Sequence, residues 1–157
     1  MDYSYVVEQS LVIPVTPPEA FDRTLPVALT EILGRWWGPV PPVTQVLGQT
    51  GEWESVGQTR TIRMAGGASM HEEMTSVDRP RSFAYRLTDI TGPMSLLIEH
   101  VLGEWMFAPA AGGTEVTWRW NIQRKSPLTS WLLPLFARAW QGYAGQGLRA
   151  LSDKLTA

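Results

Sequence analysis

The chain contains no cysteine and only two histidines, His71 and His100. The absence of cysteine excludes disulfide bonds, thiolate metal sites and a cysteine nucleophile. Two histidines leave few side chains for a multi-histidine metal centre or for a serine–histidine–aspartate triad. The sequence therefore predicts no metal site and no cofactor.

Charge is also sparse. Charged residues make up 18% of the chain, and 13 basic residues against 15 acidic ones give a formal net charge of −2. Soluble domains usually carry about 25% charged residues. Nucleic-acid binding requires a strongly basic face, so this composition argues against a nucleic-acid partner.

Long apolar runs are missing. The stretch 126–148 carries Arg138 as its one charged residue, but prolines, glutamines and three glycines interrupt it. A membrane-spanning helix needs about 20 mainly apolar residues, so we expect no stable membrane insertion. The N-terminal segment lacks a basic region and Glu8 interrupts its apolar residues, which argues against a signal peptide. The resulting expectation is a cytoplasmic protein, as a monomer or a homodimer.

Aromatic residues, in contrast, are abundant. The 157 residues include eight tryptophans, four tyrosines and four phenylalanines, and 44% of the chain is hydrophobic. This length fits one domain, so we expect a single domain over residues 1–157. Its aromatic content is sufficient to fill a large core or to line a cavity.

The hydrophobic pattern predicts a strand, two short helices, six further strands and a long C-terminal helix. The first strand, 3–13, is rich in β-branched and aromatic residues. Thr16 and Pro17 begin a helix over 17–23. Gly34 ends a second helix over 25–33. The other strands are expected at 43–47, 59–64, 69–77, 82–88, 97–107 and 114–122.

The C-terminal helix is expected over 127–155, with Ser126 as its cap. Pro134 either kinks this helix or separates a preliminary turn over 127–133 from the main helix. Gly142, Gly145 and Gly147 each weaken a helix by about 1 kcal/mol relative to alanine. Close approach to the sheet, or room for a ligand, would explain them.

Seven short segments carry a resemblance to a known family. They are Val56–Arg60, Glu72–Met74 with Val77–Pro80, Phe83–Tyr85, Trp105–Pro109, Gly113–Thr117 and Gly147–Leu151. In this order they resemble the helix-grip fold of the START and birch-allergen superfamily (SRPBCC), which includes a polyketide cyclase/dehydrase-like branch. The resemblance covers essentially the whole chain. It implies an α+β fold in which a curved seven-stranded antiparallel sheet wraps around the long C-terminal helix.

Members of this superfamily carry lipids, sense hormones or cyclise polyketides. The leading hypothesis is binding or transport of a small hydrophobic molecule, either lipid-like or an aromatic polyketide, in a cavity between sheet and helix. One alternative is a cofactor-free enzyme of the polyketide cyclase type. A further alternative is an interaction module with a filled core, which would use the adjacent Trp36 and Trp37 of a proline-rich loop.

Strand alternation and helix spacing predict which side chains line such a cavity. Two methionines on one strand favour an adaptable wall, because methionine is flexible and polarizable. The predicted lining comprises Met70, Glu72, Met74, Phe83, Tyr85, Leu87, Trp105, Trp118, Trp120, Phe136, Trp140 and Tyr143.

Glu72 is the one acidic residue in this set. Burial raises the pKa of an unpaired carboxyl, so Glu72 must pair, protonate or bind a ligand, unless it reaches water at the cavity mouth. In the plant hormone receptors of the superfamily, a glutamate at the matching place holds a polar ligand group through water. The resemblance implies the same role here. The partners considered are Arg63, Arg86, Tyr85 and the region of His100.

His100 and Glu72 are also candidate catalytic residues, because a carboxylate and an imidazole together can perform general acid–base chemistry. Counting back from Phe107 places Glu99 on the inner face and His100 on the outer face. A bulge at Gly103 would reverse this assignment, so the sequence leaves it open.

Overall fold

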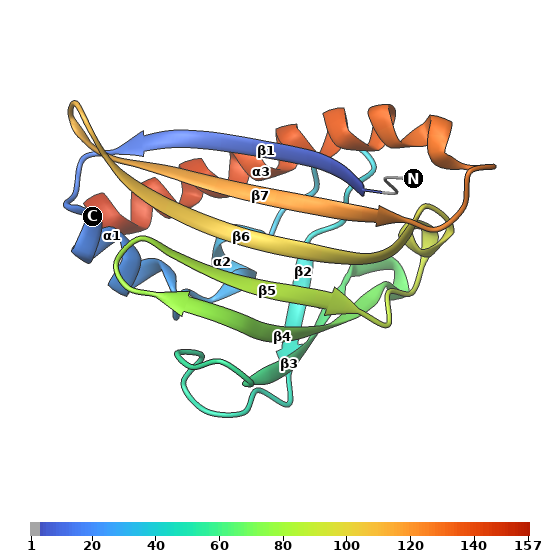
Figure 1. Cartoon of the computed structure of the whole chain (residues 1–157), viewed down its shortest axis with the longest axis horizontal. Coiled ribbons are helices and arrows are strands. Elements are labelled where there is room, and N and C mark those ends of the chain that lie inside the picture. Colours follow the sequence, from blue (N-terminus) through green and yellow to red (C-terminus); the bar gives the residue numbers. More distant parts are fainter. Residues whose placement is uncertain (1–3) are drawn as a thin grey trace.

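The computed structural model describes residues 4–157 and contains one sheet, two short helices and one long helix (Figure 1). Tyr3, the first residue of the predicted N-terminal strand, lies outside the described residues. The strands are β1 (Ser4–Ile13), β2 (Val43–Leu47), β3 (Thr59–Met64), β4 (Ser69–Asp78), β5 (Ser82–Thr88), β6 (Ile98–Ala110) and β7 (Gly113–Arg124). The α-helices are α1 (Pro17–Thr24), α2 (Leu29–Ile32) and α3 (Leu133–Thr156). Single 3-10 turns are η1 (Ala65–Gly67), η2 (Pro93–Leu96) and η3 (Ser130–Leu132).

The seven strands form one antiparallel sheet in the order β1-β7-β6-β5-β4-β3-β2. From β2 to β7 each strand pairs with the next one along the chain, whereas β1 pairs with β7. Helix α3 lies along one side of the curved sheet and packs against β1 (Figure 1). This is the α+β helix-grip arrangement that the family resemblance implied.

Helix α1 begins as its sequence predicts, because the Thr16 side chain accepts a hydrogen bond from the Glu19 amide at 3.4 Å. The predicted second helix over 25–33 is wrong in length, since only the single turn of α2 is helical. Pro26 explains the difference: it has no amide hydrogen to continue α1, and the chain must turn before α2 can start.

The C-terminal helix starts at Leu133, six residues later than predicted. Ser126 does cap a turn, since its side chain accepts from the Leu128 amide at 3.1 Å, but that turn is separate from the helix. Pro134 lies in the first turn of α3, where a missing amide hydrogen breaks no helical bond. Of the two alternatives for Pro134, separation of a preliminary turn is therefore correct.

The glycines of α3 make room for the loop after α2. A Cβ atom at Gly142 would overlap the indole of Trp37, and one at Gly147 would lie 2.7 Å from Leu33 Cδ2. Gly145 has no neighbour closer than 3.6 Å to such an atom. Of the two explanations that the sequence left open, close approach to the sheet and room for a ligand, these contacts favour close approach, but mainly to residues 33–37 and less to the sheet.

Candidate ligand-binding cavity

A cavity of about 60 Å³ lies in the core, bordered by side chains from β2 to β7 and from all three helices. Of the lining predicted from sequence, the structure places every residue except Met74 around it. Those residues are Met70, Glu72, Phe83, Tyr85, Leu87, Trp105, Trp118, Trp120, Phe136, Trp140 and Tyr143. Met74 is buried in the core but does not border the cavity.

The volume limits what fits without movement. A buried water needs about 10–15 Å³ by this measure, and an apolar cavity of ~150 Å³ holds benzene. The present space therefore holds a few waters, and even one aromatic ring requires side chains to shift. Met64, Met70 and Met94 all border the cavity, and methionine is the side chain that repacks most easily.

Four lining residues are only partly buried, and they mark where the cavity approaches the surface. Val27 and Leu29 flank the start of α2, whereas Met94 belongs to η2 and Phe136 to the first turn of α3. These two regions are the candidate openings for a ligand.

Glu72 forms an ion pair with Arg60 inside the core. The Arg60 Nε donates to Glu72 Oε1 at 2.5 Å, and the two residues are 6% and 3% exposed. They are directly opposite each other on β3 and β4. Burial raises the pKa of Glu72 above its ordinary value, and the charge and hydrogen bond of Arg60 oppose that rise.

The expectation that Arg63 or Arg86 pairs with Glu72 is wrong, because both arginines are exposed and neither bonds to Glu72. The sequence does contain the signal for Arg60. In β3 the buried positions alternate, and Arg60 is in phase with Ile62 and Met64. The same period-two rule that placed Glu72 inward also places Arg60 inward.

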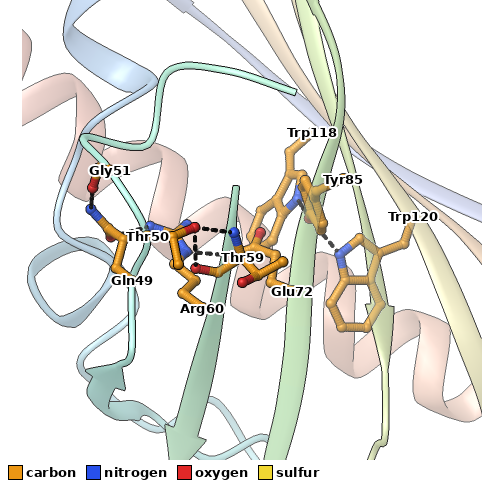
Figure 2. A network of polar contacts seen from close by, with 9 residues as sticks. All are labelled: Gln49, Thr50, Gly51, Thr59, Arg60, Glu72, Tyr85, Trp118 and Trp120. Carbon is orange, nitrogen blue, oxygen red and sulfur yellow. Dashed lines mark hydrogen bonds and ion pairs between the residues drawn. The ribbon is translucent and has the colours of Figure 1, made fainter. Parts of the chain in front are cut away.

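The loop between β2 and β3 closes over Arg60 (Figure 2). Gln49 Oε1 accepts a hydrogen bond from Arg60 Nη1 at 3.3 Å. The guanidinium carbon lies 3.9 Å from the ring centre of Trp53, which is itself buried. A cation over an indole face is attracted by the ring, so this loop stabilises the buried charge.

Tyr85 forms the second polar centre. Its Oη accepts hydrogen bonds from Trp118 Nε1 at 2.7 Å and from Trp120 Nε1 at 2.9 Å, as Figure 2 shows. Burial raises the pKa of Tyr85 far above its ordinary value, and the nearby charge of Glu72 raises it further. The hydroxyl therefore keeps its proton at any physiological pH.

Stacked aromatic rings form one wall of the cavity. The rings of Trp105 and Trp118 stack with centroids 5.0 Å apart. The Trp140 ring lies 4.9 Å from Trp118 and 5.3 Å from Trp120, and Phe136 stacks on Trp120 at 6.4 Å. Rings at these separations attract one another beyond the effect of burial alone.

Two fully buried polar atoms of lining residues have no hydrogen-bond partner within residues 4–157. They are the indole nitrogen of Trp140 and the hydroxyl of Thr24. Buried polar groups are usually paired, and each unpaired one costs about 1–3 kcal/mol.

The candidate catalytic pair of Glu72 and His100 is not formed. A register shift lies between Ile98 and His100, and Ile98 rather than Glu99 is buried. Glu99 is exposed, and its Oε2 lies 3.3 Å from Lys125 Nζ in an ion pair, so its predicted inward placement is wrong. His100 is on the outer face, as the count from Phe107 predicted. Neither Glu99 nor His100 borders the cavity.

Residues 4–157 contain no group of three or more potential ligands placed to hold a metal ion. Within the same residues, no helix is long and apolar enough to cross a membrane.

The sequence matches the family described as polyketide cyclase/dehydrase and lipid transport over residues 5–156. The chain belongs to this family. No curated protein matches it.

Solved structures share the fold at low sequence identity. Ara h 8.0201 has a TM-score of 0.66 at 16% identity, with 98% of each chain covered. A ginseng major latex-like protein from Panax ginseng has a TM-score of 0.68 at 12% identity, covering 99% of this chain and 100% of its own. A point mutant of Thalictrum norcoclaurine synthase, in complex with a transition-state analogue, has a TM-score of 0.68 at 12% identity, with 98% and 94% covered. At these identities the likeness concerns the fold.

Proposed function

We propose that the protein binds or transports a small hydrophobic molecule, either lipid-like or an aromatic polyketide, in the cavity between the sheet and α3. The observation that carries this proposal is the cavity itself, with an aromatic and aliphatic lining and only a few polar groups. Such concave apolar sites with convergent polar groups are typical ligand sites. The family, which includes lipid transport, supports the same function.

The ligand enters by displacing side chains, because the free volume is only about 60 Å³. The partly exposed Met94 and Phe136 are the residues expected to move first. An interaction module with a filled core is a weaker explanation, because a filled core needs neither residual space nor unpaired polar atoms beside it.

A cofactor-free enzyme of the polyketide cyclase type is the second candidate. The observation that favours it is the presence of Glu72 and the protonated Tyr85 in one cavity, since a carboxyl and a phenol can exchange protons with a carbonyl substrate. The related fold of norcoclaurine synthase, whose mutant binds a transition-state analogue, is compatible with this role. The buried Arg60 pair limits it, because that pair lowers the basicity of Glu72.

A thermal-unfolding screen tests the binding proposal. Fatty acids, sterols, flavonoids and aromatic polyketides are each added to the purified protein. A ligand at 100 times its dissociation constant adds about 2.7 kcal/mol to the free energy of unfolding. Leu87→Phe, which narrows the cavity, should reduce the shift. Leu102→Phe makes the same change on the outer face and should not. Absence of a shift with every class contradicts the proposal.

A further inference from the structure

The hydroxyl of Tyr85 has a proton to donate and no acceptor for it among the described residues. Its oxygen has two lone pairs, and the indole N–H groups of Trp118 and Trp120 use both. The hydroxyl proton must therefore point in a third direction. A buried donor left without an acceptor is costly, so this position favours occupation by an accepting atom.

Glu72 has the opposite deficiency. One carboxylate oxygen, Oε1, accepts from Arg60, and no described residue donates a hydrogen bond to Oε2. An ionised carboxylate accepts about four hydrogen bonds in total, so its capacity is mostly unused. Because both Arg60 and Glu72 are buried, water outside the protein does not reach this oxygen freely.

The two groups face the same cavity from adjacent strands. Glu72 pairs with Leu87 across β4 and β5, and Met74 pairs with Tyr85, so Glu72 and Tyr85 are diagonal neighbours on one face. Diagonal neighbours in a sheet are separated by about 7–8 Å at the backbone, with long side chains reaching each other. The charge of Glu72 acts on Tyr85, and both residues line the cavity. Figure 2 draws the two side chains in the same region of the sheet.

The group that fits must accept from Tyr85 and donate to Glu72. A ketone or an ether accepts but cannot donate, and an ammonium donates but cannot accept. A carboxylate cannot donate either, and the charge of Glu72 repels it. We infer that the ligand carries a neutral hydroxyl group, as an alcohol or a phenol, which bridges Glu72 and Tyr85 while its apolar part contacts the aromatic wall.

This inference rests on the proposed function, and a set of one-ring probes separates the two. Phenol, anisole, toluene and benzoate are titrated into the wild-type protein, and binding is followed by NMR of the tryptophan indole N–H groups. Transfer from water alone favours toluene over anisole and anisole over phenol. A hydroxyl bridge reverses this order and makes phenol about tenfold tighter than anisole, because a hydrogen bond to a charged group is strong.

Each outcome decides one question. If none of the four probes binds and the thermal screen of larger ligands also shows no shift, the proposed function is contradicted. If a larger ligand binds but phenol does not, the cavity binds ligands and the hydroxyl bridge is wrong. If toluene binds as tightly as phenol or more tightly, the cavity binds ligands but the hydroxyl bridge is wrong.

Variants provide an independent test. Glu72→Gln removes the charge that strengthens the bridge, so it should weaken phenol binding about tenfold and change toluene binding less than about twofold. Glu99→Gln is the matched control, because Glu99 is exposed and does not border the cavity, and it should change neither. An equal loss for phenol and toluene overturns the inference. If Glu72→Gln does not fold, the order of the four probes on the wild-type protein still decides.

Discussion

The ring of Tyr85 lies directly on the backbone of Gly103, its partner across β5 and β6. A Cβ atom at position 103 would overlap the ring and come 2.5 Å from its hydroxyl oxygen. The absence of a side chain therefore lets Tyr85 lie flat enough to meet the indoles of Trp118 and Trp120. Gly103 thus leaves room for the Tyr85 hydroxyl and its two hydrogen bonds. The pairing of β6 with β7 is regular at Gly103, so the bulge that the sequence left open does not occur there.

We expect Gly103→Ala to lower the free energy of unfolding by about 1–3 kcal/mol, because the added methyl group displaces the Tyr85 ring. The indole N–H signals of Trp118 and Trp120 should shift in NMR spectra, since their shared acceptor moves. Gly145→Ala is the control: an added methyl group there meets no atom closer than 3.6 Å, so this change should be neutral or stabilising by up to about 1 kcal/mol. Unchanged stability in Gly103→Ala would contradict the contact.

The Arg60–Glu72 pair should show strong coupling. Arg60→Met leaves the Glu72 carboxylate buried and alone, so we expect a loss of about 3–5 kcal/mol. Adding Glu72→Leu should recover most of that loss, because a well-packed apolar pair replaces a buried ion pair at little cost. Denaturant unfolding of the two single variants and the double variant measures the coupling. Additive losses would show that the charges do not depend on each other.

Thr24→Val should stabilise the protein by about 1 kcal/mol, because it replaces a buried hydroxyl that has no partner in residues 4–157 with a methyl group of equal size. For a chain of this length the melting temperature should rise by about 2–4 °C. The same substitution at Thr114 is the matched control. Its buried hydroxyl donates to the Val15 carbonyl at 2.7 Å, so Thr114→Val should be destabilising. A loss of stability in both variants would show that the Thr24 hydroxyl has a partner.

Stability should depend on pH through Glu72. Burial raises its pKa on folding, so the folded state binds the proton more tightly than the unfolded state does. The stabilisation from this group is complete below the ordinary carboxyl pKa of about 4.3 and is lost as the pH rises through the raised value. The free energy of unfolding of the wild type, minus that of Glu72→Gln, should therefore fall as the pH rises above about 4. A constant or rising difference would mean that Arg60 outweighs burial.

Strand alternation predicted most of the cavity lining because a period of two leaves little freedom once one face is buried. It held for Met70, Glu72, Phe83 and Tyr85, which all border the cavity. It failed for Glu99, because a register shift near His100 inserts an extra residue and changes the phase. Such a shift has no clear signal in a single sequence.

Met74 and Arg60 show two further limits. Met74 is in phase with Glu72 and is buried, but its backbone pairs with Gln58 next to another register shift, away from the cavity. Which buried side chains border empty space depends on three-dimensional packing, which alternation does not describe. Alternation in β3 places Arg60 on the inner face, but a charged side chain is not expected to be buried there until its partner is known.

The pairing of β1 with β7 also governs how the chain folds while it is being synthesised. Residues 4–13 leave the ribosome early, but their hydrogen-bonding partners lie at 114–123. At about 5–20 residues per second, the first strand waits several seconds or more for its neighbour, and α3, which packs against it, follows later still. The strands from β2 to β6 therefore have their hairpin partners available before β1 does. The ligand cavity forms only when the last helix has been released.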